Sequence, residues 1–166
     1  MSILGYRAKH FPESDQEIAD NDFSCGNPIV AEYHTLDRKY PDSIFITMQR
    51  DDASWLRSIR AHMNRKPVDT LRPSRRDRRL RLYGTVSPTD SELLANKHDH
   101  EADVHRYFYE RPADILYINI VDGQGWEQLR PFLNRPVLVQ PFPKRNVTSD
   151  LRGFRDVDPA DKATHA

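Results

Sequence analysis

The sequence has a single cysteine, Cys25, and only six glycines among 166 residues. One cysteine excludes an intramolecular disulfide and any metal site built from several thiolates, which suits a reducing compartment. No apolar run approaches the ~20 residues that span a bilayer, and the opening MSILGYRAKH lacks the pattern of a signal peptide. We therefore expect a cytoplasmic protein without membrane contact.

An excess of charge of one sign is also lacking, because 25 basic side chains balance 25 acidic ones. A neutral chain has no overall field that favours nucleic acid or an anionic membrane. The length suits one domain with a hydrophobic core. Any binding of anions must then come from a local arrangement of residues.

Strand and helix patterns alternate along the chain. Strands are predicted at 29–32, 44–48 and 114–120, and helices through 36–40, over 52–64, from Ser87 or Thr89 to before Pro112, and over 123–134. Thr89 and Glu92 stand at the spacing of a capping box. This alternation predicts an α/β fold with a mainly parallel sheet.

The segment RKPVDTLRPSRRDRRLRL, residues 65–82, contains eight basic residues and two prolines. It predicts an irregular loop or a broken helix, which could steer an anionic donor or flank an acceptor pocket. Aromatic residues are absent until Tyr83, so we expect no specific binding of nucleic acid.

An arginine stands where a strand turns into a helix, in FITMQRDDASWLRS at residues 45–58. Arg50 and Ser58, eight positions apart, could hold a phosphate, because a guanidinium offers paired donors and a hydroxyl adds one more. Open α/β sheets also bind ligands at the carboxyl ends of their strands. Alternatively, Arg50 pairs with Asp51 or Asp52 and Ser58 is merely solvated.

Several motifs in one order resemble the sulfotransferase family of P-loop fold. They are YPDSIFITMQRDDASWLRS, LYGT, the H(x)3V(x)2YF pattern that begins at His100, RPADILYINI, GWEQLRPFL and PFPKRN. The resemblance runs from about Leu4 to Asn146. It implies a three-layer P-loop NTPase-like fold over residues 1–146, followed by a polar tail over 147–166.

The resemblance also implies a reaction and a donor. The family transfers a sulfuryl group from 3′-phosphoadenosine 5′-phosphosulfate (PAPS) to a hydroxyl or amine, here on a small-molecule or glycan-type acceptor, without a metal. Arg50 and Ser58 match its site for the 3′-phosphate of the donor.

A base must take the proton of the acceptor, and histidine or a carboxylate suits this role. His10 and His34 lie near predicted carboxyl ends of strands, and Glu32 is the carboxylate candidate. An ordinary surface or packing role remains open for each of them.

The loop that cradles the phosphosulfate in this family has no counterpart here, since no glycine begins a G(x)4GK[ST] run. The opening SILGYRAKHF resembles the end of the helix after that loop, so the first strand and the loop are expected to be missing. Three alternative explanations are open: a gene model that starts too late, a degenerate gene, or a protein that no longer binds the sulfonate end of the donor. An exposed sheet would then favour self-association, and a non-catalytic nucleotide-binding or interaction remnant is the alternative function.

His98, His100 and His105 lie among acidic residues and raise the question of a metal site. Their spacing is not that of the HExxH motif, and i,i+2 residues point to different faces of a helix. We therefore expect a solvated helix face and no metal.

Overall fold

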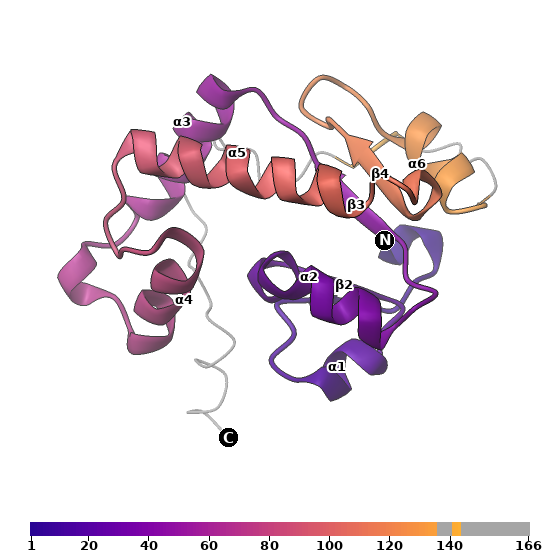
Figure 1. Cartoon of the computed structure of the whole chain (residues 1–166), viewed down its shortest axis with the longest axis horizontal. Helices are drawn as coiled ribbons and strands as arrows, with labels where there is room; N and C mark the ends of the chain where they lie inside the picture. The colour runs from indigo at the N-terminus through magenta and orange to yellow at the C-terminus, as the bar shows by residue number, and fades with distance from the viewer. Residues whose placement is uncertain (136–140, 144–166) are drawn as a thin grey trace.

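The computed structural model describes residues 1–135 and 141–143 (Figure 1). Its elements in chain order are the 3₁₀ turn Ser2–Leu4, β1 (Ala8–His10), α1 (Asp15–Ala19), β2 (Phe23–Cys25), α2 (Asn27–Lys39), β3 (Phe45–Met48), α3 (Asp52–Met63), the 3₁₀ turn η2 (Val68–Thr70), α4 (Pro73–Tyr83), α5 (Asp90–Tyr107), the 3₁₀ turn Pro112–Asp114, β4 (Ile115–Ile118) and α6 (Trp126–Phe132). No helix in these residues is long and apolar enough to cross a membrane.

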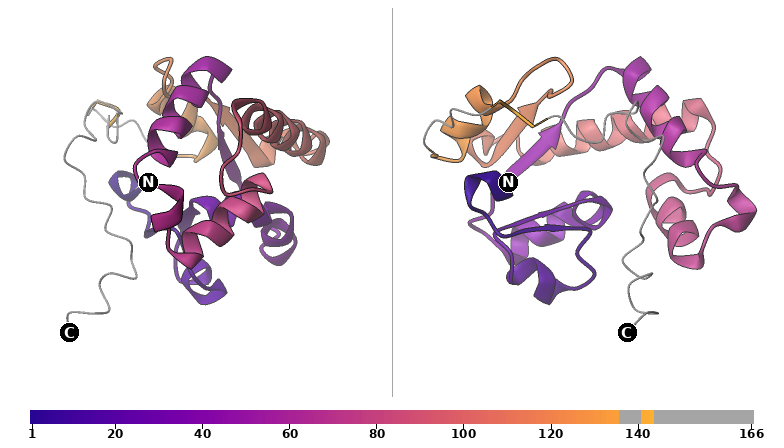
Figure 2. Two further views of the ribbon diagram at one scale, coloured as in Figure 1. Left: turned by 90° about the vertical axis from the view of Figure 1, so that its left-hand side faces the viewer. Right: turned by 180° about the vertical axis from the view of Figure 1, so that it is seen from behind.

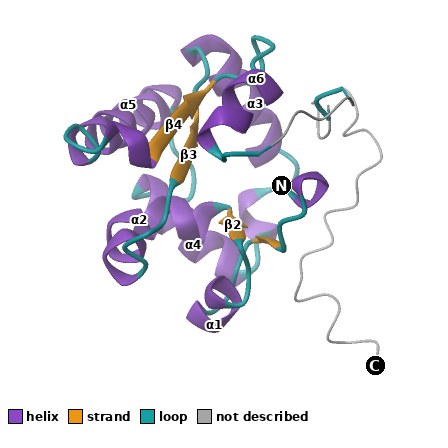
Figure 3. Cartoon of the chain, turned by 90° about the vertical axis from the view of Figure 1, so that its right-hand side faces the viewer, coloured by secondary structure: helices purple, strands orange, loops and turns teal. Residues whose placement is uncertain are grey.

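The described strands form two separate parallel pairs (Figure 3). In one pair Ala8 lies opposite Phe23, and in the other Phe45 lies opposite Ile115. The predicted mixed α/β class with parallel pairing is therefore confirmed. The described strands do not join into one sheet, however, because β1–β2 and β3–β4 share no ladder.

The predicted strand at 29–32 is wrong, because these residues belong to α2. Pro28 stands in the first turn, where its missing N–H costs no hydrogen bond. Tyr33 and Leu36 are buried, at a spacing that suits one face of a helix rather than alternate sides of a strand. The strand of this region lies earlier, at β2.

The basic segment is irregular only in its first half. A single 3₁₀ turn covers Val68–Thr70, and Pro73 then opens the regular helix α4. The helix ends at Gly84, whose φ of 69° is the left-handed conformation that glycine adopts at low cost. The prediction of a loop or broken helix was thus wrong for α4, because Pro73 starts the helix instead of breaking it.

The predicted helices at 52–64 and from Thr89 are confirmed as α3 and α5. Thr89 and Glu92 form the expected capping box at the start of α5. Helix α5 lies along the β3–β4 pair, and α3 and α4 both contact it (Figure 1).

Buried side chains from α2, α5 and β4 meet in one cluster, to which Tyr33, Phe108 and Ile115 belong. Phe45, the first residue of β3, packs against this cluster. The views from the side and from behind show the N-terminal elements below β3–β4, with α6 beside β4 (Figure 2). This cluster therefore lies at the amino ends of β3 and β4. Ile118, at the carboxyl end of β4, is also buried, with 1% of its surface exposed.

Candidate functional site

The carboxyl ends of β3 and β4 form one edge of their sheet. Met48 lies opposite Ile118, and the backbone N–H of Gln49 donates to the carbonyl of Ile118 at 2.8 Å. The chain leaves the sheet at the next residue, Arg50. This is the edge where open α/β sheets bind ligands.

Arg50 is held by a serine that the sequence interpretation did not single out. Its Nε donates to Oγ of Ser54 at 2.8 Å. The two Nη groups of Arg50 make no hydrogen bond or ion pair with another residue in the ranges 1–135 and 141–143. The outer fork of the guanidinium therefore keeps its donors for a ligand.

Asp51 is the N-cap of α3. Its Oδ1 accepts from the backbone N–H of Ser54 at 2.8 Å, and its Oδ2 accepts from the Ser54 hydroxyl. These bonds from Ser54 hold the pKa of Asp51 below its ordinary value, with nearby arginines adding to the effect. Both carboxylate oxygens of Asp51 thus accept hydrogen bonds within the first turn of α3, although its charge lies close to Arg50.

Ser58 lies one helical turn beyond Ser54 on α3 and is partly buried. Residues four apart share a helix face, so Ser54 and Ser58 follow Arg50 along one side of α3. The alternative ion pair of Arg50 with Asp51 or Asp52 does not form in the described part of the chain.

Asp52 instead binds α5. Its Oδ1 accepts from Nζ of Lys97 at 2.9 Å, and its Oδ2 lies 2.8 Å from Nε2 of His98. Lys97 also pairs with Glu101 at 2.9 Å. Burial disfavours the charge of Lys97, but the bonds to Asp52 and Glu101 outweigh this effect and raise its pKa. The start of α3, and with it Arg50, is therefore anchored to α5.

The loop after β4 is held by its own side chains. The Asn119 Oδ1 accepts from the backbone N–H groups of Val121 and Asp122, and the Asn119 N–H donates to Gln124 Oε1 at 2.6 Å. Helix α6 begins directly after Gly125, inside the range 123–134 predicted as a helix. The second segment at the sheet edge is thus an ordered turn.

The three base candidates lie in different places. His10 is exposed at the end of β1, with its ring 4.1 Å from that of Phe11. Glu32 is exposed at a kink inside α2, where its φ is −125°. His34 is also in α2, not at the end of a strand, and its Nε2 lies 3.3 Å from Oδ2 of Asp103.

The structure does not bring His34 and Arg50 together. The ring of His34 packs against Tyr107, next to the cluster at the amino ends of β3 and β4. Arg50 lies five residues after Phe45, which is about 16 Å of extended chain. His34 and Arg50 thus lie toward opposite ends of β3.

The three histidines of α5 have three different neighbours. His98 binds Asp52, His105 stacks on Tyr117 at 4.3 Å, and His100 lies edge-on to Tyr33. Burial lowers the pKa of His100. The predicted solvated helix face is therefore wrong for His100, which is partly buried. The described residues contain no group of three potential metal ligands.

Comparison with known proteins gives one positive finding. A model of the family described as "Sulfotransferase domain" matches residues 6–151, which is most of the chain. A search of curated proteins finds no match. The motif order, the parallel β3–β4 pair and the arginine at its carboxyl edge agree with this assignment, and the chain belongs to the sulfotransferase domain family.

Proposed function

We propose that this protein binds PAPS and belongs to the enzymes that pass its sulfuryl group to a hydroxyl or amine acceptor. The family membership supports sulfuryl transfer in general. The observation that carries the choice of donor is the guanidinium of Arg50, whose Nε is engaged by Ser54 while its Nη fork keeps its donors.

Arg50 and Ser58 would hold the 3′-phosphate. A phosphate accepts two parallel hydrogen bonds from the Nη groups, and the Ser58 hydroxyl adds a third from the next turns of α3. The Asp51 carboxylate opposes an anion here, and the positive end of α3 offsets part of that repulsion.

In this proposal the donor supplies an activated sulfuryl group with adenosine 3′,5′-bisphosphate as leaving group. The acceptor oxygen or nitrogen forms the new bond to sulfur as the sulfur–oxygen bond to the phosphate breaks. The proton of the acceptor passes to a base, for which His10, His34 and Glu32 remain the candidates. Positioning and cationic stabilisation dominate such transfers. Arg50, on the 3′-phosphate, would contribute to positioning the donor.

The acceptor in this proposal is a small molecule or a glycan-type hydroxyl. The separation of His34 from Arg50 along β3 favours a second candidate function, in which the chain binds the nucleotide without transfer. Release of adenosine 3′,5′-bisphosphate from PAPS with phenolic and glycan acceptors distinguishes the two functions. Turnover supports the enzyme, and binding without turnover supports the second function.

Calorimetry with adenosine 3′,5′-bisphosphate tests the site itself. Arg50→Gln should weaken binding about tenfold or more, because it loses the two charged hydrogen bonds of the guanidinium to phosphate. Ser58→Ala should weaken binding about fivefold, because it loses one hydrogen bond. Adenosine 5′-monophosphate, which lacks the 3′-phosphate, should bind all variants alike. Arg38→Gln, an exposed arginine of α2, is the matched control. Equal affinities of wild type and Arg50→Gln for the bisphosphate would contradict the proposal.

A further inference from the structure

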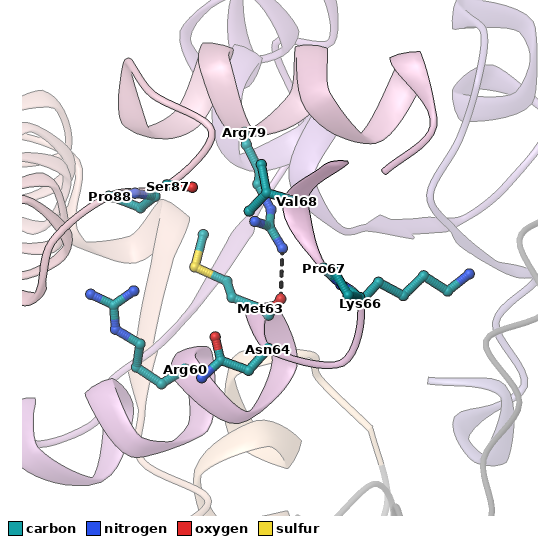
Figure 4. A pocket seen from close by; sticks show the side chains of 9 residues that line it. All are labelled: Arg60, Met63, Asn64, Lys66, Pro67, Val68, Arg79, Ser87 and Pro88. Carbon is teal, nitrogen blue, oxygen red and sulfur yellow. Dashed lines mark hydrogen bonds between the residues drawn. The ribbon is translucent and has the colours of Figure 1, made fainter. Parts of the chain in front are cut away.

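A cleft of about 450 Å³ lies where the carboxyl end of α3 meets α4 and the residues before α5 (Figure 4). This volume is within the range of small-molecule sites. Its lining residues are Arg60, Met63, Asn64, Lys66, Pro67, Val68, Arg79, Ser87 and Pro88. Three of these side chains are cationic and none is acidic.

Arg79 is the buried cation of this cleft, with only 9% of its surface exposed. Its Nη1 donates to the carbonyl of Val86 at 2.9 Å, and its Nη2 donates to the carbonyl of Met63 at 2.8 Å. Within the described ranges no carboxylate pairs with it. Carbonyls satisfy two of its five N–H donors, and no described residue compensates its positive charge, which is costly for a buried group.

The other two cationic side chains of the cleft, Arg60 and Lys66, contribute less to the attraction of an anion. Arg60 lines the cleft, but its Nε is 2.5 Å from Oδ1 of Asp90, so part of its charge is neutralised. Lys66 extends away from the other side chains (Figure 4). Arg79 therefore carries most of the attraction for an anion inside the cleft.

The remaining lining residues are mostly apolar, and Asn64 and Ser87 are the two uncharged polar ones. Met63 and Pro88 are buried, and Pro67 and Val68 continue the apolar surface. The Met63 side chain occupies the space between Arg60 and Arg79, and the exposed Ser87 lies above it (Figure 4). A fitting ligand thus combines an apolar body with one anionic group.

We propose that this cleft binds a small organic anion, with an oxyanion group on Arg79 and an apolar body against Met63, Pro67 and Val68. The carboxyl end of α3 repels anions, but Arg79 already binds its Met63 carbonyl and offsets this effect. The site is separate from Arg50, because the twelve residues of α3 span about 18 Å. The inference does not depend on sulfuryl transfer.

Calorimetry with phenyl phosphate and the purified full chain tests the proposal. Wild type should bind this probe at least tenfold more tightly than benzyl alcohol, which has the same ring and no charge. A saturating concentration of adenosine 3′,5′-bisphosphate should leave the affinity unchanged. Absent binding, equal binding of the alcohol, or competition by the bisphosphate would each overturn the proposal.

Two variants at Ser87 test whether phenyl phosphate binds in the cleft, and they leave the buried charge of Arg79 in place. Ser87→Glu places a carboxylate beside the cleft, where it competes for Arg79, and should weaken binding at least tenfold relative to the isosteric, neutral Ser87→Gln. Arg79→Lys, checked for folding by circular dichroism, should also weaken binding because it removes the planar fork.

The control is Arg81→Gln, which removes an exposed charge of α4 outside the lining of the cleft. It should change the affinity for phenyl phosphate less than twofold. A loss as large as that of Ser87→Glu would mean diffuse attraction to the basic helix. That result, or equal affinities of Ser87→Glu and Ser87→Gln, would overturn the proposal.

Discussion

The carboxylate of Asp52, in the first turn of α3, lies 2.9 Å from the ammonium group of Lys97 on α5. The Lys97 side chain is only 9% exposed and also binds Glu101, one turn further along α5. Two carboxylates thus share one buried cation. Because Arg50 stands only two residues before Asp52, this contact fixes the candidate phosphate site against α5.

Replacing Lys97 with methionine should destabilise the fold and disturb the site. The variant keeps the apolar stem but leaves Asp52 and Glu101 without their shared cation, which should cost about 2 kcal/mol of unfolding free energy. Urea unfolding followed by circular dichroism measures this loss.

Lys39→Met is the matched control for Lys97→Met. Lys39 pairs with Asp15 at 2.5 Å, but the two side chains are 43% and 71% exposed. Solvent screens such exposed pairs, so Lys39→Met should cost clearly less stability than Lys97→Met. Equal losses in the two variants would show that burial of Lys97 is not important.

Asp37 should make the stability depend on pH. It is 6% exposed and accepts from Arg111 Nη2 and from the Tyr107 hydroxyl, each at 2.7 Å. The hydrogen bonds from Arg111, and then that from Tyr107, hold its pKa below its ordinary value in spite of burial. Its contribution is therefore present above the unfolded pKa of about 4 and is lost as the pH falls through the lower folded pKa.

The variant Asp37→Asn tests this pH dependence. At pH 7 it should lose about 2 kcal/mol, a value that solvent screening of the partly exposed Arg111 keeps modest. As the pH falls below about 4, the wild-type chain should approach the variant, because Asp37 is then protonated. Urea unfolding at several pH values measures both curves, and a constant difference between them would contradict the assignment.

Ser54 should act as a positioning residue for Arg50. Ser54→Ala removes the hydroxyl that accepts from Arg50 and donates to Asp51, and should cost about 1 kcal/mol of stability. If Arg50 binds the 3′-phosphate, affinity for adenosine 3′,5′-bisphosphate should fall about fivefold, while that for adenosine 5′-monophosphate stays constant. Ser54→Thr should restore the affinity. Parallel losses for both nucleotides would indicate a purely structural role.

Gly26, which joins β2 to α2, should tolerate substitution poorly. Its φ is 109°, and an added Cβ would come within 2.9 Å of the Phe11 ring. Gly5 has a similar φ of 85°, but nothing lies within 4 Å of its Cβ position. Gly26→Ala should therefore lower the midpoint of thermal unfolding by several degrees more than Gly5→Ala. Similar midpoints would show that Phe11 moves aside at little cost.

Local chemistry made some elements predictable. Asp51 and Asp52 mark the start of α3, and Thr89 with Glu92 marks that of α5, because a cap depends only on residues three or four positions away. The strand predicted at 29–32 failed since Ile29 and Val30 have strand propensity, whereas burial of Tyr33 and Leu36 selects a helix.

The candidate site also has parts that the sequence predicts and parts that it does not. Arg50 and Ser58 could be selected from the sequence by their positions after a strand and in the next helix. The three-residue spacing of Asp51 and Ser54 is typical of a helix N-cap, so their contact also had a local signal. The pairing of Asp52 with Lys97 joins residues 45 positions apart, for which the sequence carries no local signal.

The sequence by itself determined the family, the α/β class and the arginine at the end of β3, because these depend on motif order and on local spacing. Only the tertiary structure decided that Ser54 holds Arg50 and that His34 faces Asp103 at the other end of β3. The same holds for Arg79, which lines a cleft to which the described residues contribute no carboxylate. These relationships depend on how α2, α4 and α5 pack, and packing brings together residues that spacing along the chain leaves unrelated.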